Sequence, residues 1–167
     1  MKRAIAVVLA MIPMSTFAQL YGETPIVGTV ESKCFIVTDT EGVYGNATPS
    51  NLSTDPADGG VKPIIRFDII QADAYKAVIS HPISFSQSPV LADTVTWTGS
   101  TSVGEVSDES MSDYDTNKVT YDNKTEYEMS VAGSTWFTVA SEADYGYNKA
   151  FPAGTYRAIV EAECIAQ

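Results

Sequence analysis

Residues 151–167 read Phe-Pro-Ala-Gly-Thr-Tyr-Arg-Ala-Ile-Val-Glu-Ala-Glu-Cys-Ile-Ala-Gln, and this stretch decides the fold class. Pro152 and Gly154 are typical of a turn. From residue 156 the side chains alternate between an apolar face and a mixed face. The apolar face holds Tyr156, Ala158, Val160, Ala162 and Cys164, and the mixed face holds Arg157, Ile159, Glu161, Glu163 and Ile165. Because a period of two is typical of a half-buried strand, the stretch predicts a last β-strand that carries Cys164 on its apolar side.

Residues 1–18 have the features of a signal peptide. Lys2 and Arg3 precede the apolar run 4–12, and Thr16 and Ala18 stand at the −3 and −1 positions of a cleavage site. The run is too short to span a bilayer as a permanent helix, so we expect no membrane insertion. An N-terminal core helix is the alternative, and the charged start disfavours it. We expect a mature chain that begins at Gln19 in the periplasm or outside the cell.

The mature chain is strongly acidic. Loss of residues 1–18 removes 2 of the 10 basic residues and shortens the 167-residue chain to 149, so 8 basic and 21 acidic side chains leave a net charge of −13. Such a surface repels phosphate backbones and anionic lipids, which argues against nucleic acid as a partner. The length fits one domain with its own core.

The two cysteines, Cys34 and Cys164, predict one disulfide, because an even count in an exported chain is typical of a structural bridge. A loop of this size contributes about 4–5 kcal/mol in the chain-entropy model. The alternative is a reactive cysteine, which needs a neighbouring base. The only histidine, His81, is followed by Pro82. A structural bridge between the first and last predicted strands is therefore favoured.

Short alternating segments recur between these cysteines. They include Ile65, Phe67 and Ile69; Val95 and Trp97; Val119 and Tyr121; Tyr127, Met129 and Val131; and Thr135, Phe137 and Val139. Residues 71–80 fit either a short helix or a strand, and 46–60 reads as a long exposed loop rather than a linker between domains. The segments predict an all-β domain over 34–167. Its expected architecture is a single antiparallel β-sandwich, immunoglobulin-like or pilin-like, with about seven to nine strands.

Residues 19–33 form a predicted extended leader. Ile26, Gly28 and Val30 share one face of it, and that row leads into Cys34. Glycine inside a strand often marks close approach by another backbone. Such a strand must pair with a sheet edge, in its own domain or in another copy.

The acidic stretch from Glu105 to Asp115 is the one group of residues in the sequence that could form a functional site. Asp113, Asp115 and Asn117 have the oxygen spacing of a calcium loop. Lys118 stands where that loop needs glycine, and Lys124 stands where it needs a bidentate glutamate. A solvated acidic loop is favoured over a calcium site.

No other motif indicates catalysis, a cofactor or a metal. His81 has no nucleophile signature to serve, and Gly133-Ser134 lacks the rest of a nucleophile elbow. Four strand aromatics could line a sugar-binding face, but a place in the core is the simpler interpretation; they are Trp97, Tyr121, Tyr127 and Trp136.

The layout resembles that of secreted bacterial fimbrial subunits, the chaperone–usher pilins and the spore-coat-U-like proteins. The resemblance rests on the signal peptide, on Gly28-Thr-Val-Glu-Ser-Lys-Cys34-Phe-Ile-Val and on Ala153-Gly-Thr-Tyr-Arg-Ala-Ile-Val. It implies self-assembly by donation of the leader strand to a neighbouring subunit, with a periplasmic chaperone as a partner. Two features depart from it: pilins usually pair the first cysteine with one nearby, and they usually end with an aromatic residue.

Three interpretations of function follow. The first is a non-enzymatic structural subunit of a fimbria or surface coat, acting in adhesion. The second is a monomeric binding module for glycan or protein that uses the loops 46–60 and 105–117. The third, a secreted enzyme, is disfavoured because no catalytic constellation is assembled.

Overall fold

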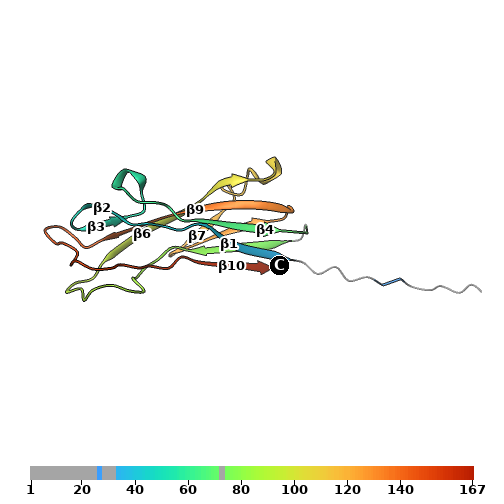
Figure 1. The fold of residues 1–167 in the computed structure, drawn as a ribbon. Helices are drawn as coiled ribbons and strands as arrows, with labels where there is room; N and C mark the ends of the chain where they lie inside the picture. The colour runs from blue at the N-terminus through green and yellow to red at the C-terminus, as the bar shows by residue number, and fades with distance from the viewer. Residues whose placement is uncertain (1–25, 28–32, 72–73) are drawn as a thin grey trace, which may run out of the picture. The chain divides into compact units, whose positions relative to one another are not determined.

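The computed structural model describes residues 26–27, 33–71 and 74–167, and the described part folds into two antiparallel β-sheets (Figure 1). The signal peptide lies outside the described residues. So does the leader, including Gly28 and Val30, except for Ile26, Val27 and Lys33. Within the described ranges, helical structure is limited to two 3-10 turns, η1 (Pro56–Asp58) and η2 (Glu109–Met111). The predicted all-β sandwich is confirmed.

The first sheet has six strands built around β9 (Gly133–Asp144). On one side, β9 pairs with β4 (Ile64–Ile69) and, further along, with β3 (Asn51–Ser53). Beyond these lie β1 (Cys34–Thr40), next to β4, and β2 (Gly45–Thr48), next to β3. On its other side, β9 pairs with β6 (Thr96–Val106) along most of its length.

The second sheet has four strands in the order β10 (Glu161–Ala166), β5 (Tyr75–Ser80), β8 (Lys124–Met129) and β7 (Val119–Tyr121). In β5, Tyr75, Ala77 and Ile79 are buried in the core. Their burial fits a period of two, so the strand alternative is correct over Tyr75–Ser80, whereas residues 72–73 lie outside the described residues.

The core consists of the alternating apolar residues of both sheets. Phe67 of β4 meets Phe137 of β9 edge to face at 5.3 Å between ring centroids, and Tyr127 of β8 lies 4.5 Å from Phe137 across the sandwich. All three are fully buried. Aromatic pairs of this geometry contribute beyond the area they bury, by about 0.5–1.5 kcal/mol each.

The prediction of a long exposed loop over 46–60 is wrong. Residues 45–53 form the β2–β3 hairpin, and η1 follows, with the Asp55 carboxylate accepting from Ala57 N at its start. This happens because β9 runs past the end of β4 and leaves an unpaired edge that Asn51–Ser53 fills. β2 and β3 lack a detectable alternation, which is why about seven to nine strands were predicted, whereas the described residues form ten.

The last strand begins later than predicted, at Glu161 rather than Tyr156. Within β10 the predicted alternation is correct, since Ala162 and Cys164 pack against the core. Before β10, the main chain of Arg157 bonds to Gln87 and Ser86 instead of extending the pairing with β5. The reason is that β5 ends at Ser80, ahead of Pro82, and Pro82 has no N–H to continue a ladder.

Candidate functional site

The free edges of β1 and β10 lie together, and we call this region the β1–β10 seam. Each strand is at the end of its own sheet, β1 pairing with β4 and β10 with β5. In Figure 1, β1 and β10 run beside each other towards the C-terminus. The Cys34–Cys164 disulfide joins them, with 6.4 Å between the two Cα atoms. The predicted disulfide is confirmed, and with both cysteines bonded neither is available as a reactive thiol.

Large apolar side chains are exposed along β1. Phe35, Ile36 and Val37 are exposed by 49%, 41% and 37%, although in the middle strands the same residue types are almost fully buried. Ile36 faces the core side of the sheet, and it is exposed because β1 has no second neighbour. An edge strand of this composition is a template for pairing with another chain.

A hollow of about 390 Å³ opens at the seam, away from the disulfide. Thr38 and Thr40 of β1 line one side, and Ala158 and Val160 line the other. Its floor includes Tyr44, whose hydroxyl is 2.9 Å from Ser141 Oγ and whose pKa is raised by burial. Polar and charged residues such as Glu41 and Arg157 line the hollow together with apolar ones such as Ile65, so its wall does not select for an apolar group.

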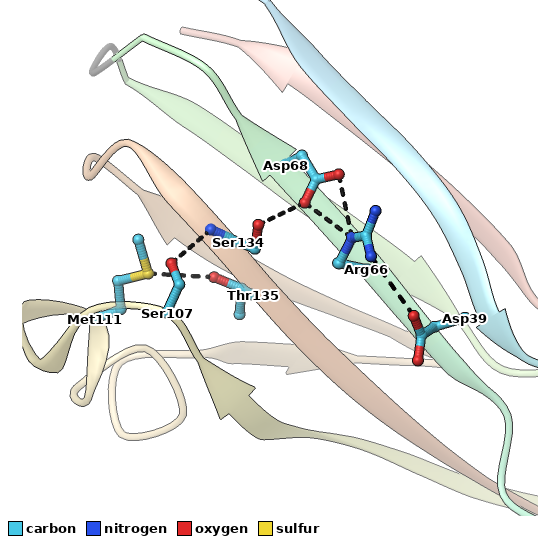
Figure 2. A network of polar contacts seen from close by, with 7 residues as sticks. All are labelled: Asp39, Arg66, Asp68, Ser107, Met111, Ser134 and Thr135. Atoms are coloured by element: carbon cyan, nitrogen blue, oxygen red, sulfur yellow. Dashed lines mark hydrogen bonds and ion pairs between the residues drawn. The ribbon is translucent and has the colours of Figure 1, made fainter.

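Polar contacts on the outer face of the first sheet link β1, β4 and β9 (Figure 2). Arg66 of β4 forms ion pairs with Asp68 at 2.9 Å and with Asp39 of β1 at 3.6 Å. Ser134 Oγ of β9 donates to Asp68 at 2.6 Å. This network was not predicted from the sequence. The alternation of Arg66 and Asp68 with Ile65, Phe67 and Ile69 could have indicated an ion pair on the outer face of the strand.

The acidic stretch continues into the connection 107–118, which closes one end of the sandwich and which we call the plug. Glu105 lies in β6, and the connection from residue 107 to 118 crosses to the other sheet. Met111 and Tyr114 are buried in the core, and the Tyr114 hydroxyl accepts from Ser130 N and Val131 N. The Asp108 carboxylate accepts from the Ser110 hydroxyl and its N–H, and these bonds lower the pKa of Asp108.

The oxygens of the candidate calcium loop have partners within the protein. Asp113 accepts from Asn117 Nδ2, and Asp115 pairs with Lys118 Nζ at 3.0 Å and accepts from Val103 N. In the described part of the chain, no group of three His, Cys, Asp or Glu side chains is placed to hold a metal ion. His81 is buried, with its ring packed against Gly99.

The four strand aromatics do not form one surface. Tyr127 is in the core, as predicted, and Trp97 packs against Phe85 in a cluster at one end of the sandwich. Trp136 and Tyr121 are not in the core. Trp136 lies on the outer face beside the Arg66 guanidinium, 5.8 Å from it, and Tyr121 donates to Glu126 on the outer face of the other sheet. Their strands are covered on one face only, so alternate residues face solvent.

Comparisons with known proteins give no match: no family model, no characterised protein and no solved structure is similar to this chain. Within 26–27, 33–71 and 74–167, no helix is long and apolar enough to cross a membrane. The disulfide is compatible with an oxidising, non-cytoplasmic compartment.

Proposed function

We propose that this chain is a secreted, non-enzymatic structural subunit of a fimbrial or surface-coat-like assembly, whose copies join by strand addition at the β1–β10 seam. The observation that carries the proposal is the exposure of Phe35, Ile36 and Val37 on a strand that pairs on one side only. Strand addition gives main-chain hydrogen bonds for affinity and side-chain pockets for register.

The leader 19–33 of a second copy is the proposed occupant of the seam. It is longer than the seven residues of β1, and it carries the row Ile26, Gly28 and Val30. The hollow beside Thr38 and Val160 has room for one of its side chains. An exported subunit with an open apolar edge needs protection before assembly, which is the role proposed for a periplasmic chaperone.

The test is a pair of matched substitutions in the full mature chain. Ile36→Lys places a charge on the seam, whereas Val119→Lys places the same charge on β7, a strand at the edge of the second sheet, where Val119 is also exposed. We expect Ile36→Lys to reduce assembly and Val119→Lys to leave it unchanged. Size-exclusion chromatography and electron microscopy measure assembly. Equal behaviour of the two variants would contradict the proposal. A parent protein that stays monomeric at high concentration would favour a monomeric binding module.

A further inference from the structure

Strand β6 is a second edge of the six-stranded sheet, on the side opposite the seam. Among the described strands it pairs only with β9, through a register that includes Ser100 with Ala140 and Ser102 with Thr138. The N–H and C=O groups of successive residues point to opposite sides of a strand, so those of Thr101 and Val103 point to the same side. This is the side away from β9, where a further strand would bind.

Two side chains from the plug occupy this edge. Val103 N donates to Asp115 Oδ1 at 3.1 Å, and Lys118 Nζ donates to Thr101 O at 3.0 Å. The carboxylate and the ammonium group are themselves 3.0 Å apart. The ion pair therefore offers one acceptor and one donor to the strand, as a neighbouring strand would. Charged side chains at an edge are a known means of blocking strand pairing.

Among the residues that the structure describes, the seam has no equivalent cover. In the ranges that the structure describes, no side chain is hydrogen-bonded to the main chain of β1 between Cys34 and Thr40. One edge of the sheet is thus covered by charge, and the other is lined by exposed apolar residues.

The sequence of β6 indicates which partner the cover excludes. Of its eleven residues, Thr-Trp-Thr-Gly-Ser-Thr-Ser-Val-Gly-Glu-Val, only Glu105 is charged. In a protein of formal net charge −11, this is a stretch on which two copies meet with little repulsion. Its length also exceeds that of the other edge strands. The edge therefore fits β6 of a second copy, paired antiparallel about a two-fold axis.

We propose that the Asp115–Lys118 ion pair is an edge cap that prevents β6 from pairing with β6 of a second copy. If the proposed function is correct, the cap also restricts assembly to the β1–β10 seam. That last consequence rests on the proposed function, whereas the cap itself does not.

The experiment removes the cap in the full mature chain. Asp115→Ala/Lys118→Ala should lower the dissociation constant for self-association by about tenfold or more, measured by sedimentation velocity, because two main-chain groups become available to a partner. Met111 and Tyr114 still hold the plug, so the fold should persist, as checked by circular dichroism. Asp93→Ala/Lys149→Ala is the matched control, since it removes an ion pair of the same 3.0 Å length away from any strand edge.

Two further variants show where the copies meet. Val103→Pro removes the N–H that a partner strand would bond, so in the uncapped protein it should abolish the new association. Ile36→Lys acts at the seam and should not affect it, which separates this test from that of the proposed function. Association that survives Val103→Pro, or a folded uncapped protein that stays monomeric, would overturn the edge cap.

If the double variant does not fold, Asp115→Ala decides. This change frees Val103 N and removes the carboxylate that holds Lys118 Nζ beside Thr101 O. New association that Val103→Pro removes supports the proposal, and an Asp115→Ala protein that associates no more than the parent contradicts it.

Discussion

Cys34 and Cys164 join the first strand of one sheet to the last strand of the other, across a sequence separation of 130 residues. Both strands are at sheet edges, so the bond fixes how far apart the two edges lie at one end of the β1–β10 seam. The disulfide thus stabilises the domain and also sets the width of the site to which we assign assembly.

Removal of this bond should destabilise the domain strongly. Cys34→Ala/Cys164→Ala is expected to lower the free energy of unfolding by about 4–5 kcal/mol at most, because the oxidised unfolded chain is constrained by a very large loop. Urea unfolding of the oxidised parent and the variant measures the difference. Thiol titration of the denatured, unreduced parent should find no free thiol, and two free thiols would contradict the bridge.

The hydroxyl group of Tyr114 should contribute to the stability of the fold. Tyr114→Phe removes the acceptor shared by Ser130 N and Val131 N, and because both residues are partly or fully exposed, the loss should cost about 0.5–1.5 kcal/mol. Tyr121→Phe is the control, since its exposed hydroxyl donates to Glu126 and its loss should cost less than about 0.5 kcal/mol. Thermal or urea unfolding compares the two. Equal effects would show that the plug does not depend on this hydroxyl.

Asp108 should make stability depend on pH in the acid range. Hydrogen bonds from the Ser110 hydroxyl and N–H lower the pKa of Asp108 in the folded protein. Its contribution is therefore fully present above the unfolded pKa of about 3.9 and is lost as the pH falls through the lower folded pKa. Asp108→Ser keeps an N-cap acceptor that does not ionise, so it should reduce the loss of stability below about pH 4. Urea unfolding from about pH 2 to 6 measures the slope, and an unchanged slope contradicts the role.

Calcium should not stabilise this fold. Asp115 is engaged by Lys118 and Val103 N, and Asp113 by Asn117, so an ion would have to displace these partners. We expect the same melting temperature with calcium and with a chelator, by differential scanning calorimetry. A rise of several degrees with calcium would identify the acidic stretch as a site after all.

The class of fold could be predicted because its core obeys a period of two. Phe67, Tyr127 and Phe137 are buried where the alternation places them, and the cysteine count was enough to predict the disulfide. A strand can be predicted from periodicity where apolar and polar residues alternate, as they do even in the three residues of β7. The sequences of β2 and β3 show no such alternation, and these strands were therefore not predicted.

The site could be predicted less well, because it depends on which strands lack a neighbour. Nothing in Phe35-Ile-Val37 distinguishes an edge strand from a middle strand, since pairing is decided by residues far away in sequence. The same holds for Asp115 and Lys118. Their spacing resembled a failed calcium loop, and their role depends on β6, which only the folded chain brings beside them.

The leader is the element on which assembly should depend. Removal of residues 19–29 should leave a folded domain, because the core strands and the Cys34–Cys164 bond all lie within residues 34–167. The truncated protein should fail to assemble, since it lacks Ile26 and Gly28, and yet its seam should still accept a synthetic peptide of residues 19–33. Gly28→Trp should weaken assembly more than folding, because a bulky side chain keeps two backbones apart. Electron microscopy measures assembly, and circular dichroism checks the fold. If the truncated protein unfolds while the full mature chain stays monomeric, the leader is a strand of its own domain, and the interpretation as a monomeric binding module replaces that of a structural subunit.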